Sequence, residues 1–195
     1  MIPDPVVRRA SETDAAEIAS VYNESILARD STMDTQPRSE ADVRALLRAL
    51  DPREAVLVLE SDSRVEGWGI VKRYSDRPGY RVACETSVYL YRNVLRRGWG
   101  RRIQYALFQF AEESGYHHMV AKIWAANRAS IAFHEACGFE LVGIQKEIGL
   151  VGDIRRDVAI MQRLLTTEGA AGSAGSGGGL SAQRVQARRK KCNPR

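Results

Sequence analysis

The 195 residues suit a single folded domain, and the 44% of hydrophobic residues are enough to build a core. The net charge of +5 is concentrated at the end of the chain, because residues 169–195 hold six basic residues and no acidic one, which leaves 23 basic against 24 acidic residues before them. A nearly neutral body argues against a nucleic-acid-binding surface on that body, and no apolar run approaches the roughly 18 residues that would span a bilayer.

The first half of the chain predicts two helices between a short strand and a hairpin. Ser11 with Asp14, and Ser39 with Asp42, have the spacing of a residue that caps a helix and an acidic residue three positions later. We expect a strand at residues 6–9, a helix from residue 14 that ends before residue 30, a polar loop at 30–37, a helix at 39–50, and an antiparallel hairpin of residues 55–60 and 65–74.

The second half alternates strands with two further helices. Residues 75–79 predict a turn that leads into a long strand at 80–90, followed by a glycine turn and a helix that Gly115 ends. A strand at 119–125, a short helix at 127–136 and a hairpin of residues 139–148 and 154–164 complete the order. This order indicates a mixed α/β domain whose strands mostly pair as hairpins, with one crossover helix after the central strand.

The end of the chain has a different composition. Residues 169–179 are almost entirely Gly, Ala and Ser, and the segment after them is short and cationic. Such a segment cannot bury enough apolar surface to offset the cost of ordering it. We therefore expect a folded domain at residues 1–166 and a disordered tail at 167–195, which is either a solvated extension or a weak contact site for nucleic acid or an anionic membrane.

The cysteines and histidines do not predict a metal site. Cys84, Cys137 and Cys192 are far apart and odd in number, and no cleavable signal sequence precedes them. His117 and His118 follow a glycine and have no clustered Cys or carboxylate partners. We expect a cytoplasmic protein with reduced thiols and no bound metal.

The turn at residues 95–103, Leu-Arg-Arg-Gly-Trp-Gly-Arg-Arg-Ile, predicts an anion site. Glycines at 98 and 100 allow close approach to backbone N–H groups that lack helical partners, and the arginines add to the positive end of the helix dipole. A phosphate or pyrophosphate would bind there, although a plain strand-to-helix corner with a solvated basic face has the same sequence. Ile103 stands where a dinucleotide fingerprint needs a third glycine, and the Gly-Lys-Ser/Thr of a P-loop is absent.

Two motifs resemble those of the GCN5-related N-acetyltransferase (GNAT) superfamily. The turn matches the family's acetyl-CoA pyrophosphate loop, except that Leu95 replaces the usual Gln or Arg, and residues 126–139 resemble its Asn-x-x-Ala/Ser…Gly-Phe segment. The resemblance covers about residues 5–165 and implies a single domain with a mixed, mostly antiparallel sheet of six to seven strands and about four helices. It also implies acetyl-CoA as cosubstrate, held by Val88, Tyr89, Leu90, Arg96, Arg97, Gly98, Trp99, Gly100, Arg101, Asn127 and Ser130.

Within the superfamily the chain is most similar to the phosphinothricin and methionine sulfone/sulfoximine acetyltransferases. The likeness rests on residues 21–23, on the turn at 79–80, on Glu85 four residues before Tyr89, and on residues 130–135. In that group the residues that match Glu85 and His134 are the proposed catalytic pair. The likeness implies an N-acetyltransferase that acts on a small amino-acid-like amine and forms a homodimer.

The chemistry of the residue types also supports acetyl transfer, beside the resemblance to the family. An ammonium must lose a proton before it attacks a thioester, so Glu85 would serve as the base, unless it is only a structural partner of an arginine such as Arg81. His134 could act as acid, as base, or as a packed histidine of the helix. Asn127 could bind the pantetheine arm or simply cap a helix. A backbone N–H near Tyr89 or Leu90 is the donor that the resemblance implies for the thioester oxygen.

The acceptor's binding residues are the least defined part of the site. We expect Tyr74, Arg77, Arg81 and Arg155 to line it, with the arginines holding a carboxylate or phosphinate, or else to be surface charges. A peptide N-acetyltransferase that uses the basic tail and a non-catalytic acyl-CoA-binding module are the alternatives.

Overall fold

The computed structural model describes residues 4–165, and the predicted tail lies outside the described residues. One seven-stranded sheet, in the order β1-β2-β3-β4-β5-β7-β6, runs through the domain, and all neighbours pair antiparallel except β4 and β5. The strands are β1 (Val6–Arg9), β2 (Ala55–Ser61), β3 (Arg64–Arg73), β4 (Ala83–Leu90), β5 (His118–Trp124), β6 (Glu140–Val151) and β7 (Ile154–Leu164). The prediction of a mixed, mostly antiparallel sheet is confirmed.

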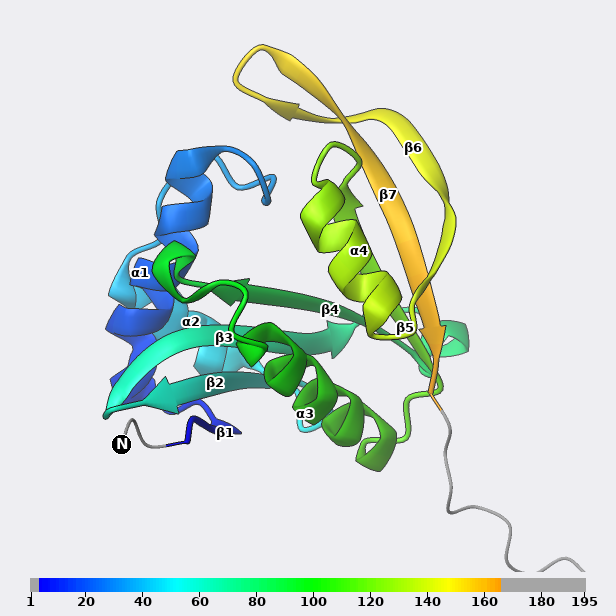
Figure 1. Ribbon diagram of the computed structural model, residues 1–195. Helices are drawn as coiled ribbons and strands as arrows, with labels where there is room; N and C mark the ends of the chain where they lie inside the picture. Colours follow the sequence, from blue (N-terminus) through cyan, green and yellow to red (C-terminus); the bar gives the residue numbers. More distant parts are fainter. Residues whose placement is uncertain (1–3, 166–195) are drawn as a thin grey trace, which may run out of the picture.

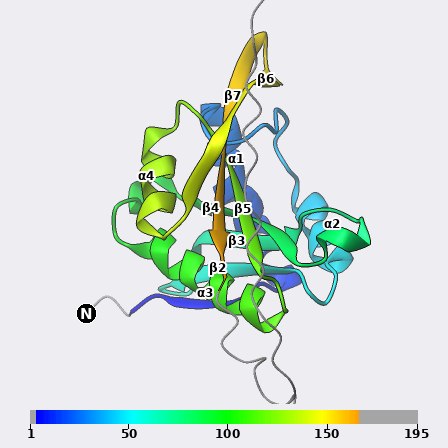
Figure 2. The same ribbon diagram turned by 90° about the vertical axis from the view of Figure 1, so that its right-hand side faces the viewer.

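Four α-helices cover the two faces of this sheet (Figures 1 and 2). They are α1 (Ala15–Ala28), α2 (Glu40–Ala49), α3 (Trp99–Glu113) and α4 (Arg128–Ala136). Figure 2 shows α3 and α4 on one side of the strands and α2 on the other. The single crossover from β4 through α3 to the parallel strand β5 is the one that the sequence predicts.

Alternation along the strands builds one core on each face. Ala55, Leu57 and Leu59 of β2 belong to the core that α3 covers, whereas Val56 and Val58 belong to the core under α1 and α2. Because side chains of a strand point alternately to the two faces, the near-continuous apolar run of β2 indicates a strand covered on both sides.

Two strand boundaries differ from the predictions by three residues. The long strand begins at Ala83 and not at residue 80, because Pro78–Tyr80 form a 3₁₀ turn in which the Arg81 N–H bonds the Pro78 carbonyl at 3.1 Å. β6 runs to Val151, beyond the predicted end at residue 148, and its hairpin with β7 projects from the body in both views. The predicted terminal hairpin is confirmed, with its turn at Gly152 and Asp153.

Candidate functional site

The two parallel strands at the centre of the sheet separate partway along their length. Residues 83–86 of β4 pair with residues 118–121 of β5, and the pairing stops there. Residues 87–90 keep only their β3 partners, and residues 122–124 keep only their β7 partners. A gap therefore opens in the sheet beside the second half of β4.

The hydrogen-bonding pattern decides which N–H groups of β4 face this gap. Tyr74 donates to the Ala83 carbonyl at 3.2 Å and Tyr91 donates to the Glu66 carbonyl at 3.1 Å, so the odd-numbered residues of β4 bond with β3. In an antiparallel pair the intervening residues point their N–H groups the other way. The N–H groups of Val88 and Leu90 thus point toward the gap, whereas that of Tyr89 points toward β3.

The turn after β4 has the geometry of an anion cradle. Gly98, in the left-handed region at φ 79°, is the N-cap of α3 without a side-chain cap, and the first helical bond runs from the Arg102 N–H to the Gly98 carbonyl at 3.3 Å. The N–H groups of Trp99, Gly100 and Arg101 therefore have no helical acceptor. A Cβ on Gly100 would lie 3.2 Å from Leu90 Cδ1, so glycine at 100 allows the helix start to approach the splayed end of β4.

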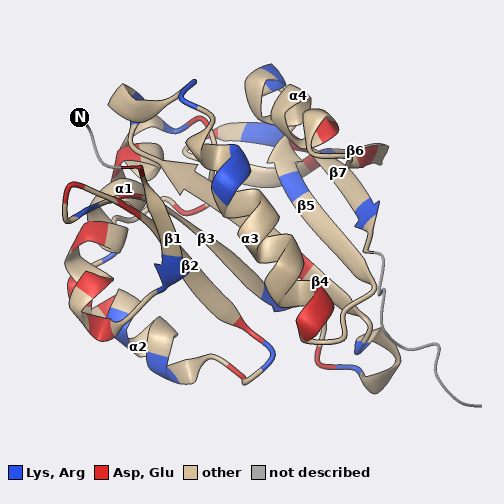
Figure 3. Ribbon diagram, turned by 60° about the horizontal axis from the view of Figure 1, so that its bottom comes forward, with Lys and Arg blue, Asp and Glu red and all other residues tan. Residues whose placement is uncertain are grey.

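The charges on α3 oppose its dipole. Figure 3 shows basic residues in the first turn and acidic residues in the last, where the opposite arrangement would stabilise the helix. Arg102 is neutralised by Asp4 at 2.8 Å, but Arg96, Arg97 and Arg101 have no carboxylate within 4.0 Å among residues 4–165. The predicted pyrophosphate site thus combines free N–H donors with unpaired cations, and its residues fit a phosphorylated ligand.

A cavity of roughly 580 Å³ lies on the opposite face of the sheet, between α1, α2 and the strands. Four aromatic residues contribute to its lining, namely Tyr22, Trp68, Tyr89 and Trp124. The rings of Tyr22 and Tyr89 meet edge to face with centroids 4.7 Å apart, and the Trp68 ring lies 5.0 Å from that of Tyr89. The volume is that of a small-molecule site.

Glu85 lines this cavity from β4. Its side chain is only 15% exposed, and its carboxylate accepts a hydrogen bond from Lys122 Nζ at 2.7 Å while Lys72 Nζ lies 3.8 Å away. The arginine partner considered from the sequence, Arg81, is exposed on the 3₁₀ turn and does not pair with Glu85. Glu85 is therefore a cavity carboxylate held between two lysines.

A loop at residues 31–38 forms one wall of the cavity, and α1 holds it in place. The Tyr22 hydroxyl bonds Thr32 Oγ1 at 2.7 Å and donates to Asp34 at 3.0 Å. The Asn23 amide donates to the Arg38 carbonyl at 2.8 Å and accepts from the Arg38 N–H at 2.7 Å. These bonds give a structural reason for the Tyr22 and Asn23 side chains in the sequence motif at 21–23.

His134 lies on the other side of the sheet from Glu85, within the core that α3 covers. Its Nδ1 is 2.8 Å from the Ser130 carbonyl, which can only accept, so Nδ1 carries the proton and the buried Nε2 keeps a lone pair without a partner. The Phe133 and Phe139 rings contact the imidazole edge to face. Desolvation by these neighbours lowers the pKa of His134, which favours the neutral ring.

Asn127 uses both ends of its side chain within the fold. Its Oδ1 caps α4 by accepting from the Ser130 N–H at 3.0 Å, as expected for an N-cap. Its Nδ2 donates to the Asp30 carbonyl at 3.3 Å, and Arg92, next to the cradle, also pairs with Asp30. Asp30 thus links the loop at 31–38 to Asn127, which the resemblance assigns to acetyl-CoA, and to Arg92, which precedes the cradle.

The four residues expected around the acceptor do not line the cavity. Tyr74 packs on Tyr80 with centroids 5.6 Å apart, Arg77 and Arg81 are exposed beside it, and Arg155 pairs with Glu147 at 2.9 Å near the tip of the β6–β7 hairpin. The cations that do line the cavity are Arg38, Lys72 and Lys122. Sequence reasoning missed both lysines. Lys72 lies an even number of positions from Trp68 on β3, and Lys122 from Trp124 on β5. Each lysine therefore points to the same face of the sheet as a tryptophan that lines the cavity.

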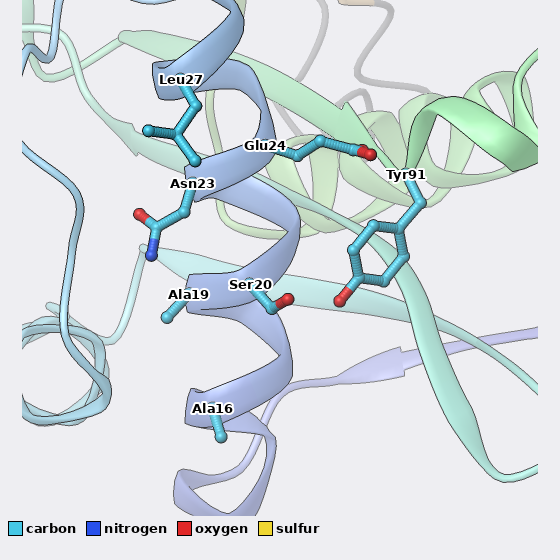
Figure 4. Close-up of a pocket in the computed structure, with 7 residues that line it drawn as sticks. All are labelled: Ala16, Ala19, Ser20, Asn23, Glu24, Leu27 and Tyr91. Carbon is cyan, nitrogen blue, oxygen red and sulfur yellow. The ribbon is translucent and has the colours of Figure 1, made fainter.

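A second hollow, of about 480 Å³, lies along α1 (Figure 4). It is lined by Ala16, Ala19, Ser20, Asn23, Glu24, Leu27 and Tyr91. The Glu24 carboxylate already accepts from the Arg92 N–H at 2.8 Å, and Asn23 is used by the loop. The polar groups left on this surface are the hydroxyls of Ser20 and Tyr91.

Residues 4–165 hold neither a metal-ligand cluster nor a membrane-spanning helix. No three His, Cys, Asp or Glu side chains come together as possible metal ligands in this part of the chain. None of its helices is long and apolar enough to cross a membrane. Cys84 and Cys137 are buried free thiols.

Comparison with known proteins gives consistent matches over the same region. The model of the "Acetyltransferase (GNAT) domain" matches residues 7–158. An L-methionine sulfoximine/L-methionine sulfone acetyltransferase of Salmonella typhimurium is 31% identical over 80% of this chain and 92% of that protein, and a phosphinothricin N-acetyltransferase of Alcaligenes faecalis is 28% identical over 82% of each. The solved phosphinothricin acetyltransferase of Sinorhizobium meliloti in complex with AcCoA superposes with a TM-score of 0.79 at 30% identity, over 89% of this chain and 94% of that one.

Proposed function

Because the chain belongs to the GNAT acetyltransferase family, we propose that it transfers the acetyl group of acetyl-CoA directly to the primary amine of a small amino-acid-like acceptor. The observation that carries this proposal is the splayed end of β4. The same strand directs the Val88 and Leu90 N–H groups toward the gap, ends beside the anion cradle, and holds Glu85 in the cavity on the opposite face. A donor site and an acceptor site thus meet at one strand.

Acetyl-CoA would supply the acetyl group as a thioester. The cradle formed by Arg96, Arg97, Gly98, Trp99, Gly100 and Arg101 would hold its pyrophosphate, and Asn127 and Ser130 would lie along its pantetheine arm. Of the gap-facing donors, we assign the Leu90 N–H to the carbonyl oxygen of the thioester, because Leu90 lies beside Gly100 at the start of α3. A fixed donor at that place stabilises the charge that develops on the oxygen.

Glu85 would be the base on the acceptor side. An acceptor in the cavity arrives as an ammonium, and a carboxylate within reach takes its proton before the nitrogen attacks. The neutral His134 has a lone pair at Nε2 and no second proton to give, so we assign it a proton-accepting role in preference to that of an acid. Because His134 lies on the opposite side of the sheet from the cavity, it would reach the reacting groups through the gap between β4 and β5 and not from beside Glu85.

The names of the relatives guide the choice of acceptor. They act on phosphinothricin and on methionine sulfone or sulfoximine, which are amino acids with a tetrahedral oxygen-bearing group in the side chain. We propose an acceptor of this type.

The exposed edge of the sheet supports the proposed homodimer. β6 is a 12-residue edge strand, and the apolar residues Leu141, Val142, Ile144, Ile148 and Leu150 on it are 44–63% exposed. A long apolar edge strand that stays exposed is unusual, because it can pair with another chain. A second copy that covers β6 would account for these residues. Light scattering on the purified protein would give twice the 21.7 kDa chain mass if a second copy does so, and the single chain mass would refute the dimer. The cytoplasmic location stays a prediction.

The test of the activity is release of CoA thiol from acetyl-CoA in the presence of phosphinothricin, methionine sulfone, ordinary amino acids, polyamines and N-terminal peptides. We expect turnover with the first two, lost in Glu85→Gln but kept in Glu66→Gln, a half-buried carboxylate of β3 outside the cavity. Turnover with peptides alone would favour the peptide acetyltransferase. Binding of acetyl-CoA without turnover of any acceptor would leave a binding module.

A further inference from the structure

The charges that line the acceptor cavity are equal in number but unevenly paired. Three carboxylates, Asp34, Asp42 and Glu85, face three cations, Arg38, Lys72 and Lys122. Asp34 is satisfied by Arg38 through bonds of 2.7 and 3.0 Å, and Asp42 accepts from the Ser39 N–H and hydroxyl at 2.8 Å each. The carboxylates at the α1 and α2 walls therefore have their own partners.

The remaining group consists of Glu85 and the two lysines. Lys122 Nζ is 2.7 Å and Lys72 Nζ 3.8 Å from the Glu85 carboxylate, and within residues 4–165 neither ammonium has another carboxylate within 4.0 Å. The side chains of Lys72 and Lys122 are 51% and 45% exposed, against 15% for Glu85. Two positive charges share one negative charge, so this part of the cavity has room for one more anion.

We propose that Lys122, assisted by Lys72, is the specificity-determining counterion for an anionic group of the acceptor. This inference rests on the proposed function. The Glu85–Lys122 pair is complementary to a zwitterion, because an α-amino acid can offer its ammonium to Glu85 and its carboxylate to Lys122 at the same time. Amines without an adjacent anion, such as polyamines or the N-terminus of a peptide, would leave the lysines unpaired.

The exchange of partners also prepares the base. While the Lys122 ammonium occupies Glu85 Oε2, that oxygen is not free to accept a proton. Once the acceptor's carboxylate takes Lys122, Oε2 can take one proton from the acceptor's ammonium. The freed nitrogen lone pair then forms the bond to the thioester carbon, the carbon–sulfur bond breaks, and the sulfur leaves with its electron pair. The second proton that the nitrogen loses on becoming an amide ends on the sulfur, which gives the CoA thiol.

The position of Lys122 suits this exchange. Its ammonium lies 5.5 Å from the centre of the Tyr74 ring, a cation–π contact that keeps the side chain at the cavity when Glu85 releases it. β5 carries Lys122 just beyond the last residue that pairs with β4, so the ammonium stands at the border between the cavity and the gap. This contact also gives Tyr74 an indirect part in the site.

The experiment compares methionine sulfone with its α-carboxamide, two acceptors that differ in the anion. We measure kcat/KM for both with the full chain, and their Kd in the presence of CoA by calorimetry, so that recognition is read independently of turnover. The variants are Lys122→Met, Lys122→Arg and the matched control Lys146→Met, whose ammonium pairs with Asp157 outside the cavity.

We expect the unaltered protein to prefer the acid by at least about tenfold, which is the range of one charge-assisted hydrogen bond. Lys122→Met should lower kcat/KM and affinity for the acid about tenfold and leave the carboxamide within about twofold. Lys122→Arg and Lys146→Met should keep the preference.

Two results would overturn the inference. One is an equal loss for both acceptors in Lys122→Met, which would mean that Lys122 only supports Glu85. The other is equal use of acid and carboxamide by the unaltered protein, which would leave the acetyltransferase proposal intact. Selective, Lys122-dependent binding of the acid without any turnover would support the inference and reject the proposed function.

Discussion

Helices α2 and α3 begin in opposite ways. The N-cap of α2, Ser39, accepts from the Asp42 N–H at 3.1 Å while the Asp42 carboxylate accepts from the Ser39 N–H at 2.8 Å, and acidic residues occupy its first turn with Arg48 in its last. α3 begins at Gly98 without a side-chain cap, has arginines in its first turn, and has no basic residue in its last. The cap and the charges of α2 are thus satisfied within the helix, whereas the free N–H groups and the arginines at the start of α3 would be satisfied by a bound anion.

This difference extends to the two sides of the sheet. On the side of α1 and α2, the loop at 31–38 is tied by hydrogen bonds of Tyr22 and Asn23, and a cavity is left within a stable frame. On the side of α3 and α4, the donors of the cradle and the Nε2 of His134 have no partner in the described residues. Unmet hydrogen-bonding groups therefore distinguish the proposed donor site, and two lysines that share one carboxylate distinguish the acceptor site.

The largest expected effect comes from Gly100→Val. A Cβ at this position would already lie 3.2 Å from Leu90 Cδ1 and 3.4 Å from the Phe133 ring, so a branched side chain would displace the first turn of α3. Loss of two N–H contacts to a phosphate would weaken acetyl-CoA binding by roughly 100-fold or more. Calorimetric titration with acetyl-CoA measures the loss.

The control is Gly143→Val, because a Cβ there meets nothing within 4 Å. It should bind acetyl-CoA like the unaltered protein. Full affinity in a folded Gly100→Val protein would mean that the cradle does not depend on the close approach of α3 to β4, and the contrast with α2 would lose its functional meaning.

The next effect separates two adjacent arginines of α3. Arg101 has no carboxylate partner among residues 4–165, while Arg102 pairs with Asp4 and donates to the Pro5 carbonyl at 3.0 Å. We expect Arg101→Ala to weaken acetyl-CoA binding about tenfold, as for one charge-assisted contact, and to reduce its salt dependence. Arg102→Ala should change affinity less than twofold, and equal losses in the two variants would contradict the assignment.

A smaller effect tests the other helix. Ser39→Ala removes the oxygen that accepts from the Asp42 N–H, and loss of such a cap lowers the free energy of unfolding by about 1 kcal/mol. Urea denaturation would measure this change, and calorimetry should find acetyl-CoA binding unaltered. A change in acetyl-CoA affinity with no change in stability would reverse the roles that we give to α2 and α3.

The fold was predictable because its signals are local. The apolar runs within residues 55–74 and the turn between them predict the β2–β3 hairpin, and the two capping boxes predict the helix starts after Ser11 and Ser39. The start of β4 was misplaced because the 3₁₀ turn is supported from a distance, by a hydrogen bond from Arg53 to the Arg81 carbonyl at 2.9 Å. A contact between residues 28 positions apart leaves no periodic trace in the sequence.

The candidate site was predictable in part. Glycine and arginine spacing predicted the cradle, and strand parity is sufficient to put Glu85 and Tyr89 on one face. The point at which β4 leaves β5 depends on packing of the whole sheet, so the free N–H groups could not be assigned to Val88 and Leu90. Lys72 and Lys122 were missed because a lysine alternating with apolar residues is also typical of a solvated strand face.

His134 is the residue whose role the sequence left open, and its protonation can be tested without substrate. Burial lowers its pKa, so the folded protein keeps the ring neutral where the unfolded chain, with a histidine pKa of about 6.5, takes up a proton. The unfolded state then binds more protons, and stability falls as the pH drops through that value. At neutral pH this effect on stability vanishes, which makes it the smallest of the four predicted effects.

Urea denaturation at about pH 7.5 and about pH 5.5, on either side of the usual histidine pKa, measures the free energy of unfolding. Between the two pH values, His134→Gln should lose less of this free energy than the unaltered protein. The control His117→Gln, at an exposed position, should lose as much as the unaltered protein. Equal losses in all three would mean that folded His134 accepts a proton readily, and the acid role at the sulfur would then be the better assignment.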